Sequence, residues 1–239
     1  NNTNFILTVT NVEDESGNAL TSATTTFTTS FPVSFNYGDV VINEIYADPT
    51  PSNGLPEEEY VELVNTTSST INLINWTYTD GSTTVTLSNY NLAVGNHLII
   101  CHEDDTALYS SYGNVLGLSS WPTLNNSGDD LGLRDGMNSL IDSVSYTSSW
   151  YQDAAKAAGG WSLERINPDA TCSDATNWKA STNGLGGSPG LQNSVFNNQP
   201  NNSLPHVKSF EIVGLNTIQL VFSKSINVSS IQTTDFSMN

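Results

Sequence analysis

Short runs in which apolar and polar residues alternate are the feature that most limits how this chain can fold. Gly, Asn, Asp and Ser bound these runs. Alternation with a period of two places apolar side chains on one face of a strand. Helical periodicity is nearly missing, and only residues 106–112 and 153–158 have the pattern of single helical turns. The pattern therefore predicts an all-β fold of antiparallel strands.

The expected strands fall into three groups along the chain. The first group, residues 5–10 and 24–29, surrounds a turn-rich stretch and predicts a terminal hairpin. The last group, residues 207–213 and 217–222, follows an Asn- and Pro-containing segment at 196–205 that has the composition of a linker. The middle group comprises residues 40–45, 60–65, 71–80, 83–87, 97–101, 131–134, 140–146 and 162–166.

The charge balance restricts the partners that this chain can bind. The 239 residues include 24 acidic and 6 basic side chains, a net charge of -18. Such a protein repels phosphates, so we expect neither nucleic acid nor an anionic membrane surface as a partner. Charged residues are only 13% of the chain, about half the usual share. A surface made soluble by Asn, Ser and Thr is common on secreted β-proteins, so we expect an extracellular location.

No targeting or membrane-spanning segment is evident in the sequence. The apolar stretches are far below the ~20 residues of a membrane-spanning helix, so we expect no membrane insertion. The sequence begins without Met or a signal peptide, and we expect a fragment or a processed chain. Cys101 and Cys172 are too far apart for a metal knuckle or a redox pair. In an oxidising compartment they can form one disulfide; the alternative is two buried free thiols.

The central segment carries several motifs in a consistent order. They are VVINEIYADP (40–49), EEYVELVN (58–65), INLINWTYTD (71–80), GDDLGLRD (128–135), DSVSY (142–146), WSLERINP (161–168), NWKAS (177–181) and GGSPGLQNSV (186–195). In this order and spacing, they resemble the lamin-tail domain, an immunoglobulin-like β-sandwich also found in secreted and surface proteins of bacteria. No heptad rod or basic localisation cluster precedes the segment, so the resemblance does not imply a role in the nuclear lamina.

Both ends resemble parts of another module, the bacterial immunoglobulin-like repeat of surface-layer and adhesion proteins. Residues 5–29 are similar to its last two strands, and residues 205–230 are similar to its first two. We therefore divide the chain into residues 1–36, the lamin-tail-like domain at 37–196, and residues 197–239. A lone two-stranded hairpin is marginal in water. We expect the ends to join into one split sandwich, within a chain or by strand exchange between chains.

One motif has the spacing of a hydrolase nucleophile. Gly186, Ser188 and Gly190 spell G-x-S-x-G, but Pro189 removes the backbone N–H that the oxyanion hole requires after the serine. Gly-Gly-Ser-Pro-Gly is better suited to a tight loop. No nucleophile, base and orienting group stand in a recognisable relation elsewhere, so we expect no catalytic residues and no enzyme.

Acidic runs are the candidates for a metal site. Glu103, Asp104 and Asp105 follow a histidine, and Asp129 and Asp130 lie in a turn-rich motif. Carboxylate oxygens suit calcium, but no complete calcium-loop or zinc spacing is present. The main interpretation is a solvated loop after a strand for the first run, and turn and strand-edge positions for Asp129 and Asp130. We therefore expect no cofactor, with calcium as the alternative.

Two glutamates lie inside predicted strands where cations are scarce. Glu44 and Glu62 are surrounded by apolar residues in VVINEI and YVELVN. An unpaired buried carboxylate is costly, and the guanidinium of Arg165 can bind a carboxylate through two hydrogen bonds. We therefore predict a structural ion pair that joins Arg165 to Glu62 and Glu44, rather than a catalytic role for these acids.

The aromatic residues divide into core and surface candidates. Trp76 and Trp178 occupy core positions of the matched motifs, whereas Trp121, Trp150 and Tyr151 lie in loop-like sequence. Aromatic side chains on a surface can stack on sugars, so these three are the candidates for a ligand face.

The expected function is a non-catalytic structural or adhesive module of a secreted or cell-surface bacterial protein, with protein or carbohydrate as its partner. The alternative is an accessory targeting or carbohydrate-binding module of an extracellular hydrolase or nuclease. Fold alone does not decide between these two roles.

Overall fold

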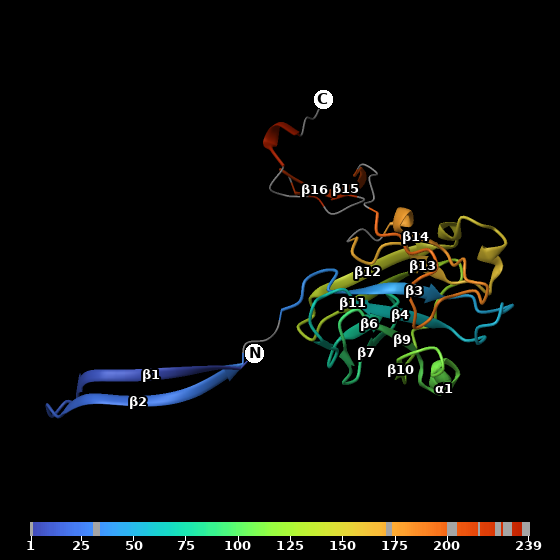
Figure 1. Ribbon diagram of the computed structural model, residues 1–239. Helices are drawn as coiled ribbons and strands as arrows, with labels where there is room; N and C mark the ends of the chain where they lie inside the picture. Colours follow the sequence, from blue (N-terminus) through green and yellow to red (C-terminus); the bar gives the residue numbers. More distant parts are fainter. Residues whose placement is uncertain are drawn as a thin grey trace. The chain divides into compact units, whose positions relative to one another are not determined.

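The computed structural model describes residues 2–30, 34–170, 174–199, 205–214, 216–222, 226 and 231–235 (Figure 1). Contacts divide the chain into two compact units, Asn1–Phe35 and Asn36–Asn239. None of the helices in the described segments is long and apolar enough to span a membrane.

The second unit contains an immunoglobulin-like β-sandwich. Its described strands are β3 (Val40–Tyr46), β4 (Tyr60–Asn65), β5 (Ile71–Asn72), β6 (Thr77–Thr79), β7 (Thr84–Thr86), β8 (Asn91–Leu92), β9 (His97–His102), β10 (Val115–Leu118), β11 (Gly128–Arg134), β12 (Leu140–Thr147), β13 (Leu163–Arg165) and β14 (Trp178–Ala180). Among these strands, one sheet has the order β10-β9-β4-β3-β13-β14, and the second has the order β12-β11-β6-β7. β5 pairs with β8. The predicted all-β class is confirmed.

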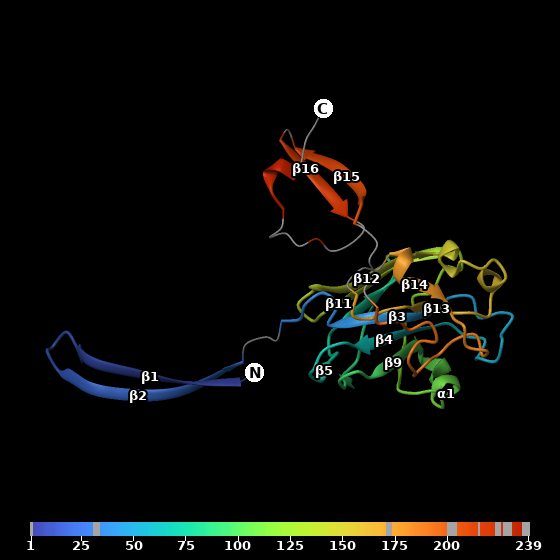
Figure 2. The ribbon, with the colours of Figure 1, turned by 45° about the horizontal axis from the view of Figure 1, so that its top comes forward.

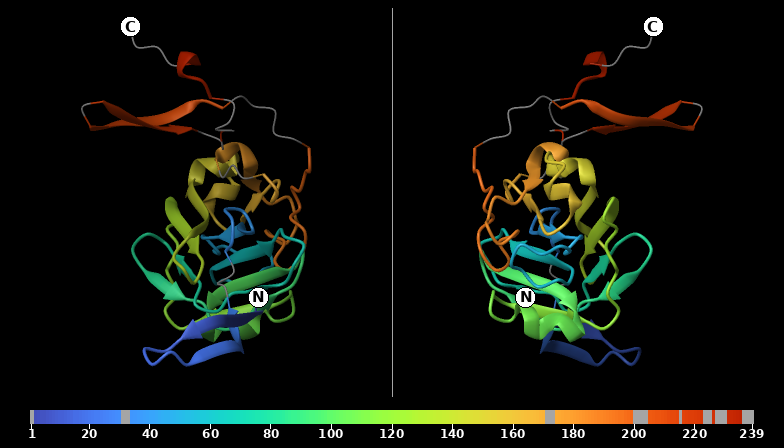
Figure 3. Two further views of the ribbon diagram at one scale, coloured as in Figure 1. Left: turned by 90° about the vertical axis from the view of Figure 1, so that its left-hand side faces the viewer. Right: turned by 90° about the vertical axis from the view of Figure 1, so that its right-hand side faces the viewer.

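The strands at the centre of the larger sheet are covered on both faces. Every residue of β3 and β4 is buried, which explains why their sequences are near-continuous apolar runs interrupted by a few polar residues. Figure 3 shows β11 and β12 on one side of this sheet and the orange segment that follows β14 on the other. Trp76 and Trp178 are buried, as predicted. The segment that follows β14 covers the outer face of the larger sheet, and it positions the candidate site.

A bulge interrupts the pairing of β3 with β4. Ile42 pairs with Leu63 and Glu44 pairs with Glu62, so Asn43 is the extra residue on β3. A bulge of this kind bends the strand and redirects the side chains next to it. Asn43 and Glu44 therefore both come close to the same segment above the sheet. Figure 2 shows β3, β4 and β9 side by side in this layer.

The helical content is limited to single turns. They are η1 (Glu103–Asp105), α1 (Thr106–Tyr109), η2 (Ser148–Tyr151), η3 (Lys156–Ala158), η4 (Ala175–Asn177) and η6 (Thr233–Asp235). The two turns predicted from the sequence overlap α1 and η3. The sequence pattern missed β10, which pairs with β9 in parallel, because its four residues are too few for a clear alternation.

Each end of the chain contains an antiparallel hairpin. β1 (Asn2–Glu13) pairs with β2 (Ala19–Ser30), and β15 (Val207–Gly214) pairs with β16 (Thr217–Phe222). Large apolar side chains on both hairpins are exposed, among them Ile6 at 71% and Phe210 at 70%. The joining of the ends, within or between chains, stays a prediction, as do the three domain boundaries.

The predicted disulfide finds no support in the described residues. Cys101 is a free thiol that packs with Tyr46, Tyr60 and Tyr109 in an apolar cluster. Burial, with a smaller contribution from Asp105, raises its pKa to about 12. Cys172 lies outside the described residues. A protonated, buried thiol of this kind is unreactive.

Candidate functional site

Three buried glutamates lie side by side across the centre of the larger sheet. Glu44 on β3 pairs with Glu62 on β4 and with Glu164 on β13. All three residues have no exposed surface. Like charges directly opposite each other destabilise a sheet, so this glutamate row (Glu62, Glu44 and Glu164) needs donors that compensate for burial.

The donors come from one segment that crosses the outer face of the sheet, residues 186–197, which we call the strap. The backbone N–H of Ser188 donates to Glu44 Oε1 at 2.7 Å, that of Gly190 to Glu62 Oε2 at 2.6 Å, and that of Val195 to Glu164 Oε2 at 3.0 Å. Each member of the row thus fixes a different point of the strap. Hydrogen bonds to charged acceptors are stronger than neutral ones.

Side-chain hydroxyls and amides supply further donors to the row, whereas Glu44 Oε2 and Glu164 Oε1 have no hydrogen-bond partner among the described residues. Ser162 Oγ donates to Glu44 Oε1 at 2.6 Å, and Ser194 Oγ donates to Glu164 Oε2 at 2.7 Å. Asn43 Nδ2 donates to Glu62 Oε1 at 3.0 Å, which is also 2.6 Å from His97 Nδ1. Polar groups of the strap and of neighbouring strands therefore take the place of a metal or a basic side chain.

A pair of asparagines joins the strap to the bulge of β3. Asn43 Nδ2 donates to Asn193 Oδ1 at 2.9 Å, and Asn193 Nδ2 donates to the carbonyl oxygens of Asn43 at 2.9 Å and Arg165 at 2.8 Å. Both side chains are buried. The amide of Asn193 thus connects the strap to β3 and β13 at once.

The pKa of Glu44, the central residue of the glutamate row, is shifted by its surroundings. Burial, followed by the charges of Glu62 and Glu164, raises the pKa of Glu44 well above its usual range, against the hydrogen bonds from Ser162 and Ser188. Burial and the nearby carboxyls of Glu44 and Glu62 likewise raise the pKa of Tyr60. The direction of this shift favours the uncharged form of Glu44, which lowers the repulsion within the row.

Glycines allow the strap to approach this closely. A Cβ atom on Gly187 would lie 2.7 Å from Glu44 Oε1 and 2.8 Å from both Leu55 Cδ1 and the Tyr60 hydroxyl. Gly190 has a φ of +77°, and a Cβ there would lie 2.1 Å from the carbonyl oxygen of Tyr112. The Gly-Gly-Ser-Pro-Gly sequence is therefore a close-packed loop, as predicted, and Ser188 is a buried part of it.

The predicted ion pair of Arg165 with Glu62 and Glu44 is wrong. Arg165 Nη2 lies 2.5 Å from Asp142 Oδ2, and its Nε donates to the carbonyl of Ile42 at 2.7 Å. Successive side chains of a strand point to opposite faces. Glu164 points to the strap, so Arg165 points into the space between the two sheets, where β12 supplies Asp142. Burial raises the pKa of Asp142, although the Arg165 charge lowers it.

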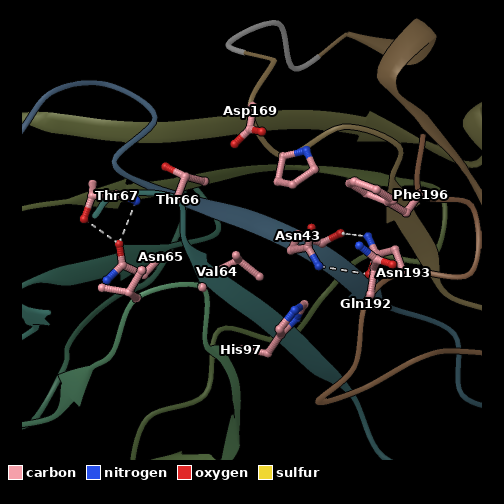
Figure 4. A pocket seen from close by; sticks show the side chains of 13 residues that line it. Asn43, Val64, Asn65, Thr66, Thr67, His97, Asp169, Gln192, Asn193 and Phe196 are labelled. Atoms are coloured by element: carbon pink, nitrogen blue, oxygen red, sulfur yellow. Dashed lines mark hydrogen bonds between the residues drawn. The ribbon is translucent and has the colours of Figure 1, made fainter. Parts of the chain in front are cut away.

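A pocket of about 270 Å³ opens beside the strap. Figure 4 shows His97 and Val64 at one side of it and Asp169 and Phe196 at the other, with Asn43 between them. His97 lines the pocket and contacts Glu62, so its ring lies between the pocket and one end of the glutamate row. The side chain of His97 is 20% exposed.

The predicted calcium candidates are not brought together. In the described part of the chain, no group of three or more His, Cys, Asp or Glu residues has a geometry that could hold a metal ion. Glu103, Asp104 and Asp105 form the exposed or half-buried turn η1, in which the Asp104 N–H donates to His102 Nδ1. Asp129 accepts hydrogen bonds from Asn125, which shapes a loop.

The predicted aromatic ligand face is only partly present. Tyr151 is buried, and its hydroxyl donates to the carbonyl of Trp161, so its assignment to that face is wrong. Trp121 is half-buried: its Nε1 donates to Glu59 Oε2 at 2.7 Å, and its ring stacks on Tyr78. Trp150 is also half-buried and packs against Trp178. The short 3-10 turn η2 rotates Tyr151 inward, which loop-like composition did not indicate.

A second, acidic hollow lies next to Trp121. Its volume is about 650 Å³, and its lining includes Glu58, Glu59, His102 and Asp104. Burial raises the pKa of Glu59, against the hydrogen bonds that it accepts from Leu124 and Trp121. Glu59 therefore positions the loop that carries Trp121.

Sequence reasoning missed several members of the site. Glu164, Asn43, Asn193 and Asp142 were not assigned to it, and His97 was not paired with Glu62. Alternation within β13 separates Glu164 from Arg165 and could have shown that the two point to opposite faces. The contacts of Asn193 with Asn43, 150 positions away, leave no local signal.

The comparisons with known proteins agree with this geometry. No curated protein matches the chain. The sequence model of the family described as Lamin Tail Domain matches residues 34–148, a segment that includes β3 to β12. Residues 34–148 are therefore similar to the lamin-tail family, an immunoglobulin-like and generally non-catalytic class of domain.

Proposed function

We propose that the chain is a non-catalytic structural and adhesive module of a secreted or cell-surface bacterial protein, in which the sandwich spaces and connects its neighbours. The observation that carries this proposal is the attachment of the strap to β3. The chain enters the sandwich at Val40 and leaves it through the strap. Both segments are bonded to each other through Asn43 with Asn193 and through Glu44 with Ser188.

This arrangement gives the sandwich a short path for force. Tension applied to the two ends of the domain acts first on the hydrogen bonds between the strap and β3, next to the centre of the larger sheet. The strap also bonds to β4 through Gly190 and to β13 through Val195. Several charge-assisted bonds must break before the strap detaches, which suits a connector under load.

The use of the buried polar groups also favours a structural role. Glu62, Glu164 and Arg165 each make at least two hydrogen bonds to other parts of the fold. The low share of charged residues and the similarity of both ends to surface-layer repeats support an extracellular location. Protein or carbohydrate on the cell surface is the proposed partner.

Single-molecule pulling of residues 1–239 between two marker domains tests the proposal. We expect one discrete rupture for the sandwich, with a length gain of roughly 550 Å for residues 40–197 at about 3.5 Å per residue. Asn193→Ala should lower the rupture force. Leu191→Ala, at an exposed position of the same strap, is the matched control and should leave it unchanged. A sandwich that unfolds without a discrete rupture contradicts the proposal.

An accessory or carbohydrate-binding module of an extracellular hydrolase or nuclease stays the alternative. It requires an exposed aromatic platform, and the two remaining candidates are Trp121 and Trp150. Binding of the full chain to a glycan array that is lost in Trp121→Ala or Trp150→Ala would favour this alternative over the structural role.

A further inference from the structure

The pocket beside the strap contains a buried acceptor that the fold leaves open. Asn43 is only 2% exposed and lines the pocket. Its Nδ2 uses both hydrogens, one toward Glu62 and one toward Asn193 Oδ1. Asn193 Nδ2 donates to two carbonyls, so Asn193 Oδ1 must accept, and the orientation of Asn43 is fixed. Asn43 Oδ1 has no hydrogen-bond partner among the described residues.

His97 supplies a second acceptor to the same space. Its Nδ1 lies 2.6 Å from Glu62 Oε1. In the neutral ring, a carboxylate at this distance favours the tautomer that carries its proton on Nδ1, and Nε2 is then an acceptor. Within the described structure, Nε2 has no hydrogen-bond partner, and the ring lines the pocket.

The remaining walls combine negative charge with apolar surface. Asp169 is exposed at the rim and its carboxylate makes no hydrogen bond to another described residue. Val94 and Phe196 also line the pocket, and both are partly exposed. Figure 4 shows Asp169 and Phe196 across the pocket from His97. With Glu62 behind His97 and a net charge of -18, this space favours cations over anions.

We infer that this pocket binds a primary ammonium group at the end of an alkyl chain, in the form of a lysine side chain of a partner protein. An ammonium group has three donors and no acceptor, which matches Asn43 Oδ1, His97 Nε2 and the Asp169 carboxylate. The alkyl stem of lysine packs on apolar side chains while its charge stays hydrated, as Val94 and Phe196 permit at the rim.

A sugar fits this set of groups less well. Its hydroxyls need donors as well as acceptors, and the hydrogens of the buried amides of Asn43 and Asn193 are already used within the protein. The amide of Gln192, an exposed residue that also lines the pocket, is a donor that remains. The inference goes beyond the proposed structural function, because the strap would bear force in the same way if the pocket bound nothing.

Titration of residues 1–239 with Nα-acetyl-lysine amide, followed by NMR of the histidine rings, tests the inference. His102→Gln and His206→Gln assign the ring signals. We expect saturable shifts at His97, with affinity on the order of millimolar. The Nε-acetylated probe, which lacks the charge, should cause no saturable shift. No saturation with the lysine probe, or equal binding of both probes, would overturn the inference.

Two charge variants distinguish binding of the lysine probe in the pocket from its attraction to the net charge of the protein. Asp169→Asn should weaken binding of the lysine probe several-fold. Asp130→Asn removes the same charge at an exposed position outside the pocket and should leave the affinity unchanged. Equal weakening by both variants would show attraction to the net charge alone and would contradict a built site. Binding of neutral monosaccharides at His97 with greater affinity than the lysine probe would also overturn the inference.

Discussion

The two faces of β13 bury charge by different means. On the face toward the second sheet, Arg165 pairs with Asp142 at 2.5 Å. On the outer face, Glu164 and its neighbours Glu44 and Glu62 have no basic partner among the described residues apart from His97. Each accepts a hydrogen bond from a backbone N–H group of the strap, and Glu44 Oε2 and Glu164 Oε1 have no hydrogen-bond partner there. One face thus uses an ion pair between elements, and the other uses a row of acids to attach a loop.

The difference shows why so acidic a chain can keep glutamates in its interior. With 6 basic residues in the whole sequence, cations cannot neutralise every buried acid. Backbone N–H groups are available in any loop, and burial together with the neighbouring carboxyls favours the uncharged form of Glu44. The cost is geometric, because the strap must come close enough for its N–H groups to reach.

Loss of the ion pair should have the largest effect. Arg165→Ala leaves Asp142 buried without its counter-ion, and we expect a loss of about 3–5 kcal/mol in the free energy of unfolding. Chemical denaturation of residues 1–239 measures it. The double variant Arg165→Met with Asp142→Leu should recover much of the loss, since it removes both charges. Unchanged stability in Arg165→Ala would mean that the pair contributes nothing to this face.

On the outer face, substitution of Glu62 should lower the stability more than substitution of Glu44, the central residue of the row. Glu62→Gln weakens bonds to Gly190, Asn43 and His97, and we expect a loss of about 1.5–3 kcal/mol, the range for hydrogen bonds to charged groups. Glu44→Gln should cost less, because burial and the charges of Glu62 and Glu164 already favour the uncharged form of Glu44. Urea denaturation of both variants checks the order. A larger loss for Glu44→Gln would contradict the raised pKa of Glu44.

The close approach of the strap can be tested directly. Gly187→Ala places a methyl group against Glu44, Leu55 and Tyr60, and we expect a loss of about 1–3 kcal/mol from overpacking. Gly184→Ala is the control, since a Cβ there meets nothing within 4 Å. Thermal unfolding compares the two variants. Equal stability would mean that the strap does not press on the row.

The smallest effect is expected in the pH dependence of stability, to which Glu44 on the outer face contributes. The pKa of Glu44 is higher in the folded state than its ordinary value of 4.5, so above pH 4.5 the folded state holds a proton that the unfolded state has released. Stability should therefore fall as pH rises through that range. Glu44→Gln should show a flatter dependence of stability on pH above pH 4.5. Asp142, whose pKa is also raised, contributes equally to the pH dependence of both proteins, so it does not affect the difference between them. Identical slopes would contradict the assignment.

Much of the fold was predictable from local pattern. Alternation located β3, β4, β9 and β12 to within about a residue or two, and the motifs placed Trp76 and Trp178 in the core. β10 and the inward rotation of Tyr151 were not predictable, because a four-residue strand and a single turn of helix carry too little periodicity. The burial of Glu44 and Glu62 was predicted correctly, whereas their partner was not.

The sequence by itself determined an acidic all-β chain with a lamin-tail-like middle and acids inside its strands, because strand alternation and burial are local properties of the residues. Only the tertiary structure decided that Arg165 turns to Asp142, that Glu164 joins Glu44 and Glu62, and that Asn193 closes the strap on Asn43. Those choices depend on strand register and on a one-residue bulge, which set the face and the neighbours of each side chain across 23 to 150 positions of chain.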